Sequence, residues 1–303
     1  MSNLVLVGAC LVLGALLRRL PTFPADSSRA LNAFVLYVAL PAQILAKMRG
    51  VSLSTAALLP ASMAWVQLGL VAVLVTGVGR ALGWPRPVRA ALMLTAGVAN
   101  TSFVGWPLIE ALVGPEGLPT AILCDQLGSF VVVSTAGVAI AAWGTGERAS
   151  LRNLSRGLLR FPALYALAGA LALHGIWLPP ALTEVFDRLG ATLTPLALVS
   201  VGLQLRVGGA SSDVPPLAVG LATKLVAVPF ALLGLYLAVG VDPGLPLRVT
   251  VLEGAMPPMI TGAILAADRG LAPTLANRMV GIGIPLGVAT VAAWSVALAR
   301  WVG

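Results

Sequence analysis

The sequence predicts an all-α polytopic membrane protein, with ten transmembrane helices arranged as two inverted five-helix repeats. The chain is 58% hydrophobic and only 10% charged, and its mean hydropathy is +0.97. Soluble domains carry about 25% charged residues. Ten apolar stretches also approach the roughly 20 residues that cross a bilayer. Finally, two of these stretches are interrupted near their middles, at corresponding positions of the two halves.

The ten expected spans follow one another with short connections. They lie at 3–20, 29–48, 55–80, 87–112, 118–143, 158–177, 181–205, 214–239, 246–267 and 273–300. The first has no basic segment before it and no small-residue cleavage site after it, so we expect a retained helix rather than a signal peptide. The seventh begins with Glu184, Asp187 and Arg188, which we expect at the membrane interface.

The basic residues predict the orientation of these spans. One set of loops holds thirteen arginines, whereas the opposite set holds Lys47, Arg49, Arg248 and Arg300. Cytoplasmic loops carry the excess of Lys and Arg. We therefore expect both termini outside and the loop at 144–157 inside, in a cell membrane and most simply a bacterial inner membrane.

The loop at 144–157 divides the chain into a first repeat, 1–143, and a second repeat, 158–303. Because five spans precede it, the second repeat must enter the membrane inverted relative to the first. At an offset of 154 residues, the interrupted segment Gly97–Pro107 overlaps Val251–Thr261. Inverted repeats of this kind support two conformations open to opposite sides, which alternating access requires.

The first interruption lies in the fourth span and contains the candidate substrate-binding residues Asn100, Thr101, Ser102, Gly105 and Pro107. A broken helix survives in a membrane only when it is buried in protein or lines a cavity. The restarting half presents unpaired N–H groups and a partial positive charge, which bind anions. Asn100, Thr101 and Ser102 add side-chain donors, and Gly105 allows close backbone approach.

The second interruption lies in the ninth span. Its candidate substrate-binding residues are Ala255, Met256, Pro257 and Pro258. A proline suits the first turn of a restarting helix, where a missing N–H costs nothing. The free carbonyls that end each first half suit a cation. Paired interruptions therefore predict a secondary transporter site for an anion.

Ionisable residues within spans are candidates for ion coupling. Glu253 lies four residues before Pro257, and Asp125 and Gln126 lie in the fifth span. Either carboxylate is suited to a coupling proton or sodium ion, so Na+ coupling, H+ coupling and uniport all stay open. We expect Lys224, near the start of the eighth span, to snorkel toward the interface.

Other classes of function find little support. The net charge of +8 reflects arginines at helix ends, so it does not indicate a nucleic-acid partner. Cys10 and Cys124 lie in apolar spans and His174 at a span end, which leaves no nucleophile–base pair or metal cluster for an intramembrane enzyme. No Walker A motif, sustained polar face or cofactor motif is present. We expect neither enzyme activity nor a cofactor.

Four ordered motifs resemble the auxin efflux carrier family. The segment Asn100–Leu108 matches the pattern N-T-x-x-x-G-x-P-L, and the segments Leu31–Pro41, Thr194–Leu203 and Leu247–Pro257 resemble its second-, seventh- and ninth-span motifs. Plant members export auxin, and bacterial members include malonate and malate carriers. The resemblance covers essentially the whole chain.

This resemblance implies the fold of bile acid sodium symporters. Spans 1, 2, 6 and 7 would form a scaffold that joins a homodimer. Spans 3–5 and 8–10 would form a transport core, in which spans 4 and 9 cross at their prolines. The core would move past the scaffold as an elevator, and Asn100 would bind the substrate carboxylate.

The chain departs from the plant members at Phe161-Pro162-Ala163, where they carry Asn-Pro-Asn, which puts auxin itself in doubt. Glu253 is similar to the sodium-ligating glutamate of the bile acid symporters, which implies a sodium site at Asn100 and Glu253. We therefore expect a secondary carrier of a small organic anion, such as malonate, malate or an auxin-like acid. The alternative is sodium-coupled carriage of an amphipathic or sterol-like acid, with an intramembrane enzyme as a distant third.

Overall fold

The computed structural model describes residues 2–24, 26–51, 55–147, 162–205 and 214–301, and these are all-helical. Six helices among them are long and apolar enough to cross a membrane. They are Ser27–Met48, Thr55–Ala81, Pro115–Thr145, Pro180–Gln204, Val214–Ala238 and Pro273–Trp301. The expectation of an all-α polytopic membrane protein is confirmed at this level.

Two shorter apolar helices and two interrupted helices accompany the six. The shorter ones are Val5–Leu17, within α1 (Ser2–Leu17), and α11 (Pro162–Ala172). The interrupted ones correspond to the expected fourth and ninth spans. The count of ten spans and the inverted repeat remain predictions, and residues 148–157 of the expected linker lie outside the described residues.

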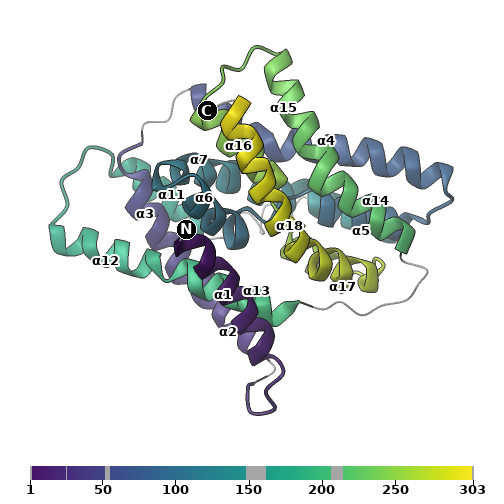
Figure 1. The fold of residues 1–303 in the computed structure, drawn as a ribbon, viewed down its shortest axis with the longest axis horizontal. Helices are drawn as coiled ribbons and strands as arrows, with labels where there is room; N and C mark the ends of the chain where they lie inside the picture. The colour runs from purple at the N-terminus through teal and green to yellow at the C-terminus, as the bar shows by residue number, and fades with distance from the viewer. Residues whose placement is uncertain (1, 25, 52–54, 148–161, 206–213, 302–303) are drawn as a thin grey trace.

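The helices pack in two groups (Figure 1). Helix α1 packs along α13 (Leu193–Gln204), while α3 (Leu40–Met48) packs against α11 and α12 (Pro180–Ala191). The pairing of α1 with α13 is close because two glycines face each other. A Cβ on Gly14 would overlap the carbonyl of Val199, and one on Gly202 would overlap that of Leu11. We call α1, α2 (Ser27–Phe34), α3 and α11–α13 the first group.

The second group surrounds the two interrupted helices. It consists of α4 (Leu58–Ala81), α5 (Arg86–Ala96), α6 (Trp106–Leu112), α7 (Leu118–Leu123), α8 (Phe130–Val132), α9 (Val138–Thr145), α14 (Val214–Ala222), α15 (Val228–Ala238), α16 (Leu245–Ala255), α17 (Ile260–Asp268) and α18 (Pro273–Trp301). Helix α5 packs on α4, α9, α17 and α18, and α16 packs on α4, α15 and α18. Both interrupted helices are therefore enclosed by protein.

Short π-helical segments occur within several helices of this group. They are Thr101–Gly105 (η3), Cys124–Ser129 (η5), Val133–Gly137 (η6) and Thr223–Ala227 (η8). A further one, Val35–Ala39 (η1), lies between α2 and α3. Such bulges are often found at functional sites, because the extra residue redirects side chains and frees backbone groups. Residues of η3, η5 and η6 line the cavity described below.

Candidate transport site at the crossing of two broken helices

Two helical stretches of the second group are each divided into two segments. Helix α5 ends at Ala96 and helical structure resumes in η3 and α6, while α16 ends at Ala255 and α17 begins at Ile260. We call the segments 97–100 and 256–259 the first and second breaks. Pro107 is the second residue of α6 but the seventh of the half-helix that begins at Thr101, so it does not lie in the first turn of the restarting helix. Pro257 and Pro258, in contrast, precede α17 and belong to the extended segment of the second break.

The two breaks cross each other and pair through their backbones. Ala99 and Pro258 form an antiparallel bridge. The N–H of Asn100 donates to the carbonyl of Pro257 at 2.9 Å, and that of Met259 donates to Thr95 at 3.3 Å. Backbone groups freed by the breaks therefore satisfy one another, which burial in a membrane protein requires.

Glycines allow the close approach of helices at this crossing. A Cβ on Gly262 of α17 would overlap the carbonyl oxygen of Leu94 in α5. On α18, Gly287 lies against Pro257 and Gly283 against Pro258, with hypothetical Cβ contacts of 2.6 and 2.7 Å. Small residues at these positions thus hold the second break between α5 and α18.

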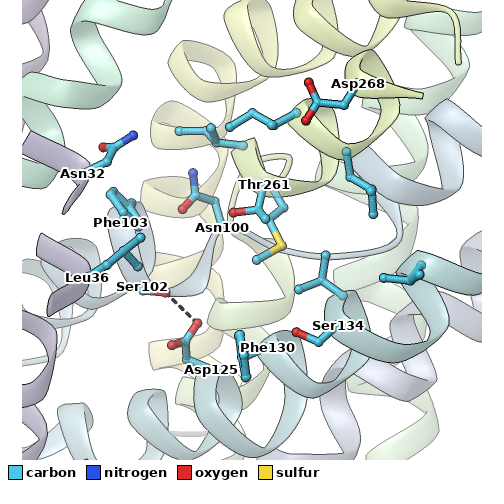
Figure 2. A pocket seen from close by; sticks show the side chains of 16 residues that line it. Asn32, Leu36, Asn100, Ser102, Phe103, Asp125, Phe130, Ser134, Thr261 and Asp268 are labelled. Carbon is cyan, nitrogen blue, oxygen red and sulfur yellow. Dashed lines mark hydrogen bonds between the residues drawn. The ribbon is translucent and has the colours of Figure 1, made fainter. Parts of the chain in front are cut away.

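A cavity of about 520 Å³ opens beside the crossing (Figure 2). Its polar lining includes Asn100, Ser102 and Asp125, which the sequence nominates, together with Asn32, Ser134, Thr261 and Asp268. The rest of the lining is apolar and comes from Leu36, Phe103, Phe130, Val133, Val138, Met259, Ile260, Ile264 and Leu265. The cavity therefore joins both breaks, the fifth expected span and α2 of the first group.

Asn100 supplies a free donor at this cavity. Its side chain is 4% exposed, and its Nδ2 atom has no hydrogen-bond partner among the described residues. Leaving a buried amide unpaired is costly, so the group is suited to a ligand that completes it. Thr261, in the first turn of α17, lines the same cavity (Figure 2).

Asp125 is held by three donors from its surroundings. Its Oδ1 accepts from Thr101 Oγ1 at 2.5 Å and from Ser102 Oγ at 2.7 Å, and its Oδ2 accepts from Gln126 Nε2 at 2.6 Å. Thr101 and Ser102 begin the half-helix that follows the first break, where the helix dipole favours an anion. The carboxylate of Asp125 therefore fills the anion position that the sequence assigns to a substrate at this break.

Glu253 lies in the last turn of α16 and is completely buried. Neither of its carboxylate oxygens has a hydrogen-bond partner within the described part of the chain. It packs on Gly105, where a Cβ would overlap the carboxylate, so this glycine accommodates Glu253 rather than a ligand in the cavity.

The remaining nominated residues lie outside the cavity lining. Ala255 and Met256 are buried in the core beside Glu253. Pro107 lines a second, smaller cavity of about 290 Å³ together with Glu110 and residues of α3 and α12. That cavity lies where α6 meets the first group of helices, and Lys47 and Asp187 in its lining form an ion pair at 3.3 Å.

The expectation for Lys224 is wrong. Its side chain does not snorkel to an interface but is completely buried, and Nζ donates to the carbonyl of Gly254 at 2.7 Å. Lys224 is the eleventh residue of the expected span 214–239, so it lies well inside the span rather than at its end. A basic residue at that depth, one span before a span that carries an intramembrane glutamate, is the sequence signal for a buried contact of this kind.

Comparisons with known proteins agree with these features. An all-helical chain with several membrane-length helices and a buried crossing belongs to the class of polytopic membrane proteins. The family model described as membrane transport protein matches residues 2–295, so the chain belongs to this family, whose members include the auxin efflux carriers.

Its relatives are named as transporters. An "uncharacterized transporter" of Methanothermobacter thermautotrophicus is 28% identical over 98% of this chain and 97% of its own length. The transporter YfdV of Escherichia coli K12 is 24% identical over 88% of this chain and 87% of its own length. MJ1031 of Methanocaldococcus jannaschii is 28% identical over 38% of each chain. These names indicate a transporter rather than an enzyme.

Proposed function

We propose that this protein is a secondary transporter of a small organic anion, which binds at the crossing of the two breaks. One observation supports this above all: Asn100, whose Nδ2 has no hydrogen-bond partner among the described residues, lines the same cavity as the first turn of α17. The first N–H groups of a helix lack intrahelical partners, and the first two residues of α17, Ile260 and Thr261, line the cavity. A carboxylate there would accept from the amide and from the helix N-terminus together.

The lining favours one carboxylate on an apolar body. Among the described residues, those around the larger cavity include Asp125 and Asp268 but no lysine or arginine, and most of the lining is apolar. A second carboxylate of malonate or malate would find no basic partner and would meet these acidic side chains. An auxin-like or other amphipathic monocarboxylate suits the cavity better.

An elevator movement is the proposed route across the membrane. The first group of helices corresponds to the scaffold, with a homodimer joined through it, and the second group to the transport core. The two groups meet along limited contacts, such as α1 with α6 and α13 with η3. The larger cavity contacts η3 and the smaller one contacts α6, so a movement of this half-helix relative to the first group would change both cavities.

The test is transport by the purified, reconstituted protein. Solid-supported-membrane currents and radiolabelled uptake would be recorded for monocarboxylates with apolar bodies and for dicarboxylates. We expect saturable transport of the former, and a loss of about tenfold or more in affinity in Asn100→Ala, because a hydrogen bond to a charged group contributes roughly 1.5–3 kcal/mol.

The matched control is Asn277→Ala, which removes an exposed amide of α18 outside the cavity lining. It should transport as the wild type does. Equal transport by Asn100→Ala and Asn277→Ala would exclude the crossing as the substrate site. Preference for dicarboxylates would exclude the proposed substrate class.

A further inference from the structure

Lys224 is a buried cation in the middle of the second group of helices. It lies in η8, and its side chain is 0% exposed. No other lysine or arginine of the described residues is so completely buried. A buried charge is costly without a partner, so the position of its ammonium group demands an explanation.

The ammonium group lies at the C-terminal end of α16. Nζ donates to the carbonyl oxygen of Gly254 at 2.7 Å, one residue before the helix ends at Ala255. The last carbonyls of a helix lack intrahelical partners and carry a partial negative charge, which a cation stabilises. Lys224 therefore occupies the position that the free carbonyls of a broken helix offer to an inorganic cation.

Glu253 is the anionic candidate for balancing this charge. It precedes Gly254 in the chain, to which Lys224 is bonded, and it is equally buried. Its carboxylate oxygens make no hydrogen bond to Nζ or to any other described group, so the pairing we consider is one of charge without direct contact. Asp125 is a second buried carboxylate and would repel a charged Glu253. The oxygens of Asp125 already accept hydrogen bonds from Thr101, Ser102 and Gln126. Among the lysines and arginines of the described residues, Lys224 alone is fully buried, and its ammonium group reaches the residue that follows Glu253.

A sodium ion at Glu253 and Asn100 fits this arrangement poorly. The carbonyl of Gly254 is already bonded to an ammonium group. Gly105 closes another side of the carboxylate. A second cation beside Lys224 would also be repelled strongly, because the site is removed from water.

We propose that Lys224 is the resident counter-cation of Glu253 and takes the place of a coupling Na+ at the second break. The pairing of Lys224 with Glu253 does not depend on which substrate the protein binds. Only its consequence for transport, that the substrate is carried without Na+ bound at Glu253, rests on the proposed function. The experiment therefore uses the full-length protein in detergent, without any carboxylate.

Thermal unfolding of four proteins tests the balance: the wild type, Lys224→Gln, Glu253→Gln and the double variant. Removing one partner of a buried charge pair is strongly destabilising, so each single variant should unfold at least about 5 °C lower. The double variant should recover much of this loss. Lys47→Gln, which changes the other lysine of the chain at a partly exposed ion pair, is the control and should shift little.

Additive losses in the double variant would overturn the proposal. If Lys224→Gln does not fold, a folded double variant still supports it, whereas a double variant that fails while Glu253→Gln folds overturns it. A second measurement, binding of radioactive Na+ to the purified wild type, should show no saturable component that Glu253→Gln removes. Such a component would also overturn the proposal. Neither result depends on carboxylate transport, so failure of the proposed function would be seen separately.

Discussion

At the first break, Asp125 faces the start of the half-helix formed by η3 and α6, whereas at the second break Lys224 binds the end of α16. Gln67, a neutral residue of α4, takes the equivalent position at the end of α5 and donates to the carbonyl of Ala96 at 3.1 Å. Each break thus has one terminus matched by a charged side chain of the protein. The charges are of opposite sign because the termini are of opposite polarity.

This difference leaves one terminus for a ligand. The start of η3 is covered by Asp125, and the ends of α5 and α16 are covered by Gln67 and Lys224. The start of α17 lines the cavity beside Asn100. The crossing therefore pairs similar backbone segments but differs in the side chains that cover their helix ends. Asn100 of the first break and the start of α17 after the second break both line the larger cavity.

Among variants that test this difference between the two breaks, Asp125→Ala should cause the largest loss of stability. It leaves the donors of Thr101, Ser102 and Gln126 without their acceptor in a buried site. Each such loss costs about 1–3 kcal/mol, so we expect the protein to be destabilised by about 3 kcal/mol or more. Thermal unfolding in detergent measures this change.

Asp125→Asn is the control for that variant, because one oxygen remains to accept from Thr101 and Ser102. It should unfold well above Asp125→Ala. Equal unfolding temperatures would mean that the three hydrogen bonds do not organise the first break.

The backbone crossing itself is tested by Gly262→Ala. The added Cβ overlaps the carbonyl of Leu94, and a backbone atom yields less readily than a flexible side chain. Overpacking of this kind costs roughly 1–3 kcal/mol, and α17 should shift away from α5. Gly69→Ala in α4, where a Cβ meets nothing within 4 Å, should leave stability unchanged or slightly raised. Equal effects of the two variants in thermal unfolding would contradict a tight crossing.

The prediction of the two breaks rests on local features of the sequence. Proline and glycine interrupt helical hydrogen bonding wherever they occur in an apolar segment. Interruptions at Gly97–Pro107 and Met256–Pro257 can therefore be predicted without tertiary information. Asn100 can be nominated as a site residue for a related reason, since a polar side chain beside a break in a membrane helix has few partners.

The side chains that complete the site could not be predicted in this way. Lys224 reaches Gly254 across 30 positions of the chain, and whether a lysine snorkels outward or bonds inward depends on helix rotation. Asn32, Thr261 and Asp268 line the cavity only because α2 and α17 converge on it. For Gly105, the backbone freedom was foreseen, but its contact with Glu253 depends on the distance between two half-helices.

A smaller effect is expected at Gln67, the neutral counterpart of Lys224. Gln67→Met keeps the volume but removes the hydrogen bond to Ala96, which contributes about 0.5–1.5 kcal/mol. Its Oε1 has no partner within the described chain, so removing this buried acceptor offsets part of the loss. We expect a net destabilisation below about 1 kcal/mol, clearly less than for Lys224→Gln. Both losses are measured by thermal unfolding. If Gln67→Met destabilises the protein more than Lys224→Gln does, the charge of Lys224 is not what stabilises the end of α16 at the second break.

The smallest effect should occur at an exposed ion pair, where charge is present but burial is not. Arg188 and Glu184 pair across one turn of α12 at 2.6 Å, and both side chains are mostly exposed. Exposed helical pairs contribute only about 0.3–0.5 kcal/mol and are screened by salt. Arg188→Gln should therefore unfold near the wild type at low salt and indistinguishably from it at high salt. If Arg188→Gln lost as much stability as Lys224→Gln, removing any charge would have this effect. Burial of Lys224 at a helix terminus would then not explain its contribution to stability.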